Sequence, residues 1–261
     1  MQFRNVLGGL ATLGLAMTAL GGLAHAQDGS LKDSAPPPAR QFTFSANVGV
    51  TSDYVFRGFS QKNENPALQG GFDIGYGLFY AGVWGSGVDF GEDATTLQSL
   101  GRVEIDYYAG IKPTLGPVNF DLGIIYYTYP GAFDPAAETD YFEGKFGAST
   151  SFNKLTIAGT VFYSPDYTLE LGPATTLEGG LSYELPAVAN ITPTVSGLVG
   201  TTLFSDNSAL DYVYWNAGVG LGFSSNFSID LRYWGTSEEG FCGVQNLCDD
   251  RFVATAKVAL P

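Results

Sequence analysis

The sequence predicts an all-β protein that forms a transmembrane, antiparallel, up-and-down β-barrel of about twelve strands. Three observations support this fold class. Apolar and polar residues alternate with a period of two in segments of roughly ten residues, the length of a tilted strand that crosses a bilayer. No helical pattern separates these segments, which excludes α/β folds. The connections alternate between short turns and long loops, as in membrane barrels.

Twelve segments, taken in order along the chain, account for the strand number. In the first of them, Phe42, Phe44 and Val48 alternate with small or polar residues. The segments at 79–88 and 191–204 are β-like, but the pattern does not distinguish their faces. A soluble β-sandwich, which also alternates, is the alternative fold. The expected strands are 42–50, 68–76, 79–88, 102–112, 118–126, 142–149, 155–163, 176–185, 191–204, 213–223, 227–233 and 251–260.

The connections between these segments fall into two classes. Short turns are expected near residues 77, 115–116, 153, 186–190 and 224–226. Long loops are expected at 52–65, 89–99, 130–139, 164–175, 205–209 and 237–249. An even number of strands places both chain ends on the periplasmic side, where the short turns of such barrels lie.

Aromatic residues gather near the ends of the expected strands. Two aromatic girdles, one at each membrane interface, are therefore predicted. The outer girdle would contain Tyr126, Tyr127, Tyr129, Tyr163, Tyr212, Tyr214, Trp215, Tyr233 and Trp234. The inner girdle would contain Phe42, Phe44, Phe79, Phe223 and Phe227.

The first 26 residues predict a secretory signal peptide. Arg4 precedes an apolar stretch, and Ala24-His25-Ala26 is a small-x-small cleavage site. The alternative, a transmembrane anchor, fits less well because the stretch is short and rich in glycine. Residues 27–40, with three consecutive prolines at 36–38, predict a flexible periplasmic tail. The barrel domain is then 41–261, in the outer membrane of a Gram-negative cell.

Composition limits the function. The 261 residues are 45% apolar, too many for a disordered chain. There are 26 acidic and 12 basic side chains, so the chain repels nucleic-acid phosphates. Cleavage removes the single histidine, His25, so histidine-based catalysis and metal ligation are not expected. We expect a protein that is not an enzyme and carries no cofactor or metal.

Several segments resemble the TorF family of outer-membrane proteins. The resemblance is specific at Ser52-Asp53-Tyr54-Val55-Phe56-Arg57-Gly58-Phe59-Ser60-Gln61 and continues at 66–71, 79–86 and 126–132. Weaker similarity occurs at 104–110, 167–172 and 211–212. The resemblance implies a proteobacterial outer-membrane barrel with a proposed role as a porin, and it transfers no catalytic residues. One departure is the C-terminus, Leu260-Pro261, where many such barrels end in an aromatic residue.

The faces opposite the apolar residues carry charges that would line the lumen. They form either a solute path lined by fixed charges or a salt-bridged plug that fills a narrow barrel. Arg102, Glu104 and Asp106 are expected to form one charged rung. The candidate lumen residues are Asp73, Arg102, Glu104, Asp106, Lys112, Asp121, Glu143, Lys145, Glu178, Glu184, Asp230, Arg232, Arg251 and Lys257.

The first long loop holds Arg57 and Lys62, the two bases assigned to the long loops. It is either an infolded constriction that contacts solute, or a loop ordered by pairing of Arg57 with Asp53 or Glu64, and the second interpretation is favoured. The last long loop holds Cys242 and Cys248, for which a disulfide is predicted in a secreted protein. The alternative, a metal site with two thiolates, lacks supporting histidines.

The predicted function is passive diffusion of small hydrophilic solutes or ions through an outer-membrane porin-like channel. The alternative is a non-conducting structural or adhesive barrel. The long loops and their junctions carry sixteen of the acids. This rim is expected to attract cations and to bridge to anionic lipopolysaccharide through divalent ions, both weakened by salt. The expected partners are outer-membrane lipid, lipopolysaccharide and small hydrophilic solutes.

Overall fold

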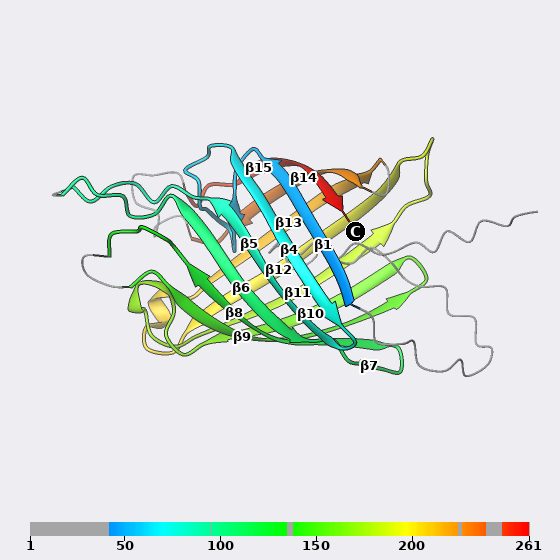
Figure 1. Ribbon diagram of the computed structural model, residues 1–261, viewed down its shortest axis with the longest axis horizontal. Coiled ribbons are helices and arrows are strands. Elements are labelled where there is room, and N and C mark those ends of the chain that lie inside the picture. Colours follow the sequence, from blue (N-terminus) through cyan, green and yellow to red (C-terminus); the bar gives the residue numbers. More distant parts are fainter. Residues whose placement is uncertain (1–41, 95, 135–137, 224–225, 239–246, 261) are drawn as a thin grey trace, which may run out of the picture.

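The computed structural model describes residues 42–94, 96–134, 138–223, 226–238 and 247–260. Long antiparallel strands form one closed barrel (Figure 1). The strands are β1 (Phe42–Thr51), β4 (Ala67–Tyr76), β5 (Phe79–Gly87), β6 (Val103–Ile111), β8 (Val118–Thr128), β9 (Tyr141–Phe152), β10 (Leu155–Ser164), β11 (Ala174–Glu184), β12 (Thr192–Phe204), β13 (Tyr212–Gly222), β14 (Phe227–Thr236) and β15 (Arg251–Leu260). The predicted fold class and strand number are confirmed.

Each long strand pairs with the next one along the chain, and the first pairs with the last. Val48 of β1 lies opposite Val258 of β15, which closes the barrel between the two ends of the domain. The short strand β7 (Thr114–Leu115) pairs antiparallel with the start of β8, and a separate hairpin is formed by β2 (Val55–Phe56) and β3 (Phe59–Ser60). The remaining elements are two single-turn 3-10 helices, η1 (Thr168–Glu170) and η2 (Ser208–Leu210). In the described ranges, helices with the length and hydrophobicity to cross a membrane do not occur.

Long and short connections lie at opposite ends of the barrel, which we call the loop end and the turn end (Figure 1). At the turn end, β4 and β5 are joined through Gly77, whose φ of 62° suits a tight hairpin. Asn153, with a φ of 57°, makes the equivalent turn between β9 and β10. The loop end holds the long connections, as the spacing of the strands predicted.

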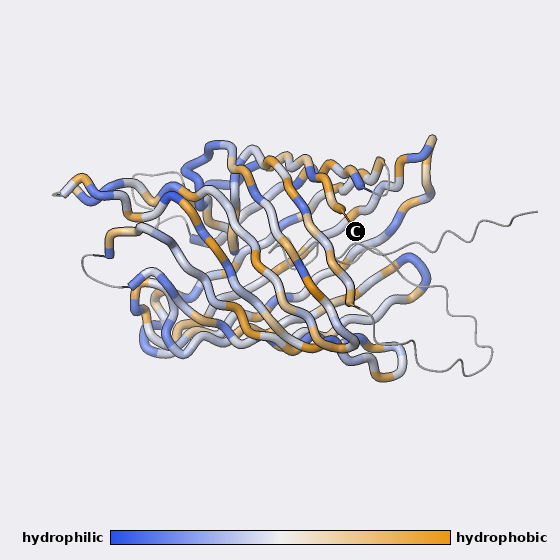
Figure 2. Tube along the Cα trace, in the orientation of Figure 1, coloured by the Kyte–Doolittle hydropathy of each residue, from blue (hydrophilic) through white to orange (hydrophobic). Residues whose placement is uncertain are grey.

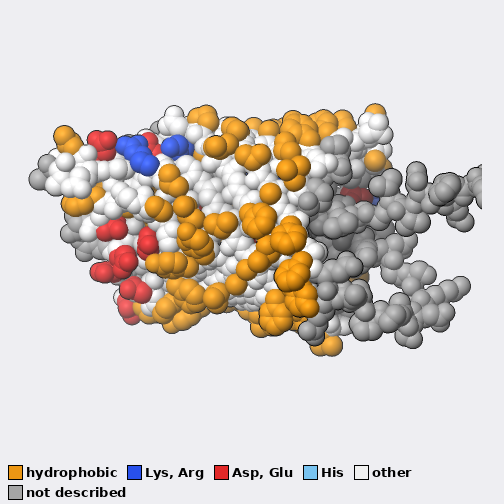
Figure 3. Space-filling view, in the orientation of Figure 1, with side chains coloured by type: hydrophobic (Ala, Val, Ile, Leu, Met, Phe, Trp, Pro, Cys, Tyr) orange, Lys and Arg blue, Asp and Glu red, His pale blue; other side chains and the backbone are white. Residues whose placement is uncertain are grey.

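Large apolar side chains are exposed on the outer surface of the barrel, as Figure 3 shows. Hydrophobic and hydrophilic positions follow one another along the strands (Figure 2). On β1, Val48 and Val50 are 50% and 53% exposed, whereas Thr51 is buried. A soluble sandwich would bury such residues, so this surface agrees with a barrel that faces lipid. The outward set includes Phe44, Leu68, Phe72, Ile74, Leu122, Ile124, Phe146, Leu181, Val195, Val199, Leu231 and Phe252.

The packed core lies inside the barrel. Its most enclosed large side chains are Tyr127 and Tyr214, each 1% exposed, and Trp84 and Trp234 are each 4% exposed. These residues correct the prediction of an outer aromatic girdle. Tyr126, Tyr163 and Trp215 do point outward, but five members of the predicted girdle are buried inside the barrel: Tyr127, Tyr129, Tyr212, Tyr214 and Trp234.

The inner girdle is at the turn end. Phe42, Phe44 and Phe79 are between 58% and 66% exposed there. The predicted signal peptide, the predicted tail and Cys242 lie outside the described residues. Cleavage and the disulfide therefore remain predictions, and Cys248 is buried.

Candidate functional site inside the barrel

The connection between β1 and β4, residues 52–66, folds into the barrel, and we call it the inner loop. Tyr54, Val55 and Arg57 are each 4% to 5% exposed. Ser60 of the β2–β3 hairpin is buried as well. The inner loop therefore occupies part of the lumen near the loop end.

Contacts of the inner loop reach strands all around the wall. In the strand order, β10 is the strand farthest from β1, so a loop that leaves β1 and reaches β10 crosses the lumen. The Arg57 guanidinium lies 4.8 Å from the ring of Phe162 on β10. The ring contacts of the loop are Tyr54 with Trp84 on β5, Phe56 with Tyr127 on β8, and Phe59 with Tyr212 on β13.

Arg57 forms a buried ion pair with Glu143 on β9. Its two terminal nitrogens lie 2.7 and 2.9 Å from the two carboxylate oxygens. Tyr127 donates to the same carboxylate at 2.9 Å, and the Tyr167 hydroxyl lies 3.3 Å from the guanidinium. The Phe56 ring is also 4.8 Å from the guanidinium carbon. Two parallel charge-assisted hydrogen bonds fix the position of the arginine.

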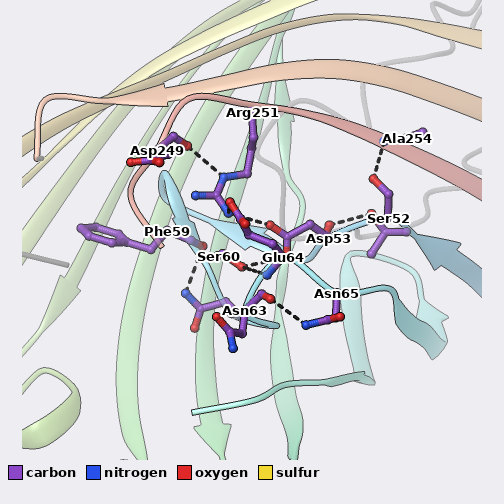
Figure 4. Close-up of polar contacts among 12 residues, drawn as sticks. Ser52, Asp53, Phe59, Ser60, Asn63, Glu64, Asn65, Asp249, Arg251 and Ala254 are labelled. Atoms are coloured by element: carbon purple, nitrogen blue, oxygen red, sulfur yellow. Dashed lines mark hydrogen bonds and ion pairs between the residues drawn. The ribbon is translucent and has the colours of Figure 1, made fainter. Parts of the chain in front are cut away.

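A second group of polar contacts anchors the base of the inner loop (Figure 4). Arg251, at the start of β15, lies 2.9 Å from Asp53 and 3.5 Å from Glu64. Ser60 donates to Asp53 at 2.8 Å. Burial raises the pKa of Asp53 above its ordinary value near 3.8, and the contacts with Ser60 and Arg251 oppose that rise.

These contacts correct the favoured interpretation of the first long loop. Arg57 does not pair with Asp53 or Glu64, because both of those carboxylates bind Arg251 instead. Lys62 donates to the backbone oxygen of Val88 at 3.0 Å. The loop is infolded, which was the alternative interpretation.

Most of the predicted lumen charges do lie on the inner face. Lys145 pairs with Asp121 at 2.7 Å, and Arg232 pairs with Asp230 at 2.9 Å. Lys112, just beyond β6, stands 4.4 Å from the centre of the Tyr80 ring. Lys257 lies near enough to Asp73 to interact electrostatically. Their role in solute passage stays a prediction.

Two predicted lumen residues lie elsewhere. Arg102 precedes β6, has a side chain that is 47% exposed, and pairs with Asp89 and Glu92 in the second long loop. Arg102 therefore does not line the lumen together with Glu104 and Asp106. The strand begins at Val103, one residue later than predicted. Glu184 pairs with Lys154 at 3.7 Å, with both side chains partly exposed at the turn end.

The structure adds tyrosines that the sequence did not assign to the lumen. Tyr108 on β6 donates to Asp73 on β4 at 2.6 Å. Between them, Gly82 on β5 is the register partner of both residues. A Cβ at Gly82 would lie 2.5 Å from the Tyr108 ring, so glycine is required for the tyrosine to cross the strand.

The same arrangement recurs elsewhere in the barrel. Tyr214 on β13 reaches Glu178 on β11 across Gly200 of β12. Tyr80 donates to Asp121 at 2.7 Å. The sequence signal that could have identified these tyrosines is glycine at inward-facing strand positions. Each such glycine lies opposite a tyrosine on the neighbouring strand.

Residues 35–259 match the model of a family described as "Bacterial protein of unknown function (Gcw_chp)". The chain belongs to the Gcw_chp family. No sequence among curated proteins matches this Gcw_chp chain.

Solved structures similar to the Gcw_chp barrel include porins. A KdgM porin aligns with a TM-score of 0.54 at 6% identity, over 83% of this chain and 98% of that one. A KdgM porin described as in complex with disordered oligogalacturonate gives 0.50 at 7% identity, over 83% and 96% of the chains. A NanC porin gives 0.50 at 8% identity, over 84% and 100%. At these identities the likeness establishes a porin-like barrel fold.

Asp106 of the Gcw_chp barrel is a fully buried acidic residue whose carboxylate lacks a described hydrogen-bond partner. Asp106 is 0% exposed, and both of its carboxylate oxygens lack a hydrogen-bond partner within the described ranges. Its register partners on the neighbouring strands are Trp84 and Tyr127, which pack against the inner loop. Asp106 therefore lies on the part of the barrel wall that the inner loop contacts.

The interior of the Gcw_chp barrel is thus a charged wall crossed by one docked loop. The inner loop occupies part of the lumen, and the wall around it carries fixed charges. Among the described residues, no three or more His, Cys, Asp or Glu side chains gather as a metal site would require.

Proposed function

We propose that this protein is an outer-membrane porin-like channel for passive diffusion of small hydrophilic solutes or ions. The carrying observation is a closed barrel whose outer face is apolar and exposed and whose inner face is polar and charged. An apolar exterior lets the barrel reside in lipid, and a polar interior offers a path for hydrated solutes. The inner loop forms the constriction of that path.

Fold similarity to the KdgM and NanC porins supports the proposal at the level of architecture. The KdgM description names oligogalacturonate as a ligand of that porin, which illustrates a charged solute in a similar barrel. The resemblance of residues 52–61 to the TorF family points in the same direction. We also propose that the barrel lies in the Gram-negative outer membrane, that residues 1–26 are a cleaved signal peptide, and that the chain is a member of the TorF family.

A non-conducting structural or adhesive barrel is the second candidate, and the inner loop is the observation that favours it. The buried Arg57–Glu143 pair holds the loop across the lumen, with side chains only 3% and 2% exposed. A permanently docked loop would restrict flux. The channel proposal therefore requires either residual space beside the loop or displacement of the loop.

Lipid and lipopolysaccharide are the proposed partners of the outer surface. Acidic side chains gather at the loop end beyond the apolar belt (Figure 3). Glu138, in the connection between β8 and β9, and Asp166 and Glu170, in the connection between β10 and β11, are exposed. Divalent cations can bridge such carboxylates to anionic lipopolysaccharide, in a manner that salt weakens. We propose no enzymatic activity, and hydrolysis of lipid by the pure protein would contradict this.

The decisive experiment is conductance in planar lipid bilayers with the purified chain. Heat-dependent migration on a detergent gel first establishes that the barrel is folded. Discrete current steps, with a reversal potential under a salt gradient, are the expected result. A folded barrel that gives no current over many insertions would favour the structural candidate.

A further inference from the structure

The pocket that holds the Arg57 side chain has the composition of a guanidinium-binding site. Glu143 binds both terminal nitrogens, and Tyr127 holds the carboxylate in place. The ring of Phe162 covers the guanidinium carbon at 4.8 Å. Bidentate carboxylate binding beneath an aromatic face is how proteins recognise planar organic cations. Tyr127, Glu143 and Phe162 all belong to barrel strands, so the pocket remains when the loop leaves.

The wall around this pocket carries several buried carboxyl groups besides Glu143. Asp106 is fully enclosed, has no partner for either oxygen in the described part of the chain, and interacts electrostatically with Glu104 and Glu143. Oε2 of Glu178, which interacts with Arg57 and Glu143, is also buried without a partner there. Enclosing a carboxylate without a partner is unfavourable. The wall therefore has unused acceptor oxygens for an additional hydrogen-bond donor or cation.

The inner loop is not part of the backbone ladders of the barrel wall. The β1–β4 ladder runs to the pair Thr51–Ala67, and the β1–β15 ladder runs to Thr51–Thr255, so the loop lies outside both ladders. Arg57 has a φ of 48°, a left-handed conformation that is unfavourable for a residue with a side chain. This backbone conformation costs energy in the docked loop and so opposes docking.

We infer that the pocket of Tyr127, Glu143 and Phe162, with Asp106 beside it, binds guanidinium and alkylguanidinium solutes, and that Arg57 occupies it as a tethered competitor. This inference rests on the proposed function only for the route by which a solute reaches the pocket. Docking of the inner loop and binding of a free cation exclude each other. Cationic solutes of this class therefore favour the displaced loop.

The test measures binding of ethylguanidinium to the purified full chain in detergent by isothermal titration calorimetry at constant ionic strength. Arg57→Ala removes the tethered competitor, so we expect it to bind about tenfold or more tightly than the wild type. Adding Glu143→Gln to Arg57→Ala should abolish this gain. The matched control is Arg102→Ala, which removes an exposed arginine and should behave as the wild type. N-ethylurea, which is planar and neutral, should bind to none of them.

Equal affinity in the wild type, Arg57→Ala and the double variant would overturn the inference. If Arg57→Ala does not fold, Arg57→Lys keeps the charge but loses the bidentate geometry, and it should bind more tightly than the wild type. Unchanged affinity in Arg57→Lys would also count against the pocket. The titration needs no current: binding without conductance would overturn the channel alone, and conductance without binding would overturn the pocket alone.

Discussion

The Tyr214 hydroxyl on β13 donates a hydrogen bond to Glu178 on β11, two strands away, across Gly200 on the strand between them. Tyr108 and Asp73 repeat this arrangement across Gly82. In each case the absent side chain of the glycine leaves room for a tyrosine to lie flat on the inner wall. The lumen acids are thus held by hydroxyl donors from strands that are not their neighbours.

Replacing the central glycine should break this arrangement. In Gly82→Ala, the new Cβ would stand 2.5 Å from the Tyr108 ring, so the ring must move away from Asp73. We expect the free energy of unfolding to fall by about 1–3 kcal/mol, the cost of a buried polar group that loses its hydrogen bond. Urea unfolding in lipid vesicles, followed by gel migration, measures this change.

The matched control for this prediction is Gly179→Ala on β11. A Cβ at Gly179 meets nothing within 4 Å, so its effect on the free energy of unfolding should stay within about 0.5 kcal/mol. Tyr108→Phe should reproduce most of the loss in Gly82→Ala, because it removes the same hydrogen bond. Equal stability of the two alanine variants would mean that the tyrosine does not depend on Gly82.

Much of the fold could be predicted because a barrel strand repeats its pattern locally. Phe252 at 81% exposure and buried Val253 illustrate the alternation that gives the faces. The same rule could have corrected the outer girdle. Tyr126 and Tyr127 are adjacent in one strand and must face opposite ways, so one of them had to be inside.

The contacts of the inner loop could not be predicted in this way. Arg57 and Glu143 are 86 positions apart, and their meeting depends on barrel closure and on the direction in which the loop folds. Nearby acids such as Asp53 and Glu64 were the natural partners by sequence distance, yet the backbone turns Arg57 away from them. Arg251, at the start of the last strand, becomes their partner only because β15 closes against β1.

The Arg57–Glu143 pair should be important for stability. Arg57→Ala leaves the Glu143 carboxylate buried, with the Tyr127 hydroxyl as a remaining donor. We expect the free energy of unfolding to fall by about 3–5 kcal/mol. Because both residues serve one interaction, the double variant with Glu143→Gln should cost less than the sum of the two single variants.

A control for the double-mutant cycle is the exposed ion pair of the second loop. Arg102→Ala removes contacts to Asp89 and Glu92, and such a pair contributes about 1 kcal/mol or less. Strict additivity of Arg57→Ala and Glu143→Gln would show that the two side chains do not interact in solution. Unfolding curves in the same vesicles give all four values.

The buried carboxyl of Asp53 should make stability depend on pH. Burial raises its pKa in the folded barrel above 3.8, so the folded state holds this proton more tightly than the unfolded chain does. The stabilisation is fully present below the unfolded pKa and is lost as pH rises through the folded pKa. The stability of the wild type relative to Asp53→Asn should therefore increase as pH falls from neutrality toward 4.

Ser60 provides an internal check on this pH dependence. Its hydroxyl donates to Asp53 and lowers the pKa, so Ser60→Ala should move the transition to higher pH. Unfolding midpoints measured at several pH values, at one salt concentration, test both variants. A stability difference between wild type and Asp53→Asn that does not change with pH would contradict the assignment.

The exposed acids at the loop end should bias the entry of ions. Neutralising Glu138, Asp166 and Glu170 together removes three negative charges from the rim while leaving the lumen wall intact. At about 0.01 M salt the Debye length is roughly 30 Å, so the wild-type rim enriches cations at the mouth, and the triple variant should lose part of the cation preference. At about 1 M salt the Debye length falls to roughly 3 Å, so the reversal potentials of the two proteins should converge. Glu184→Gln removes an acid at the turn end and is the control. The change that it causes in the reversal potential should depend on the side of the bilayer at which salt is varied, and in a different way from the change caused by the triple variant. A triple variant with unchanged reversal potential at low salt would place the origin of selectivity in the lumen, with its Asp121 and Lys145 pair, and not in the rim.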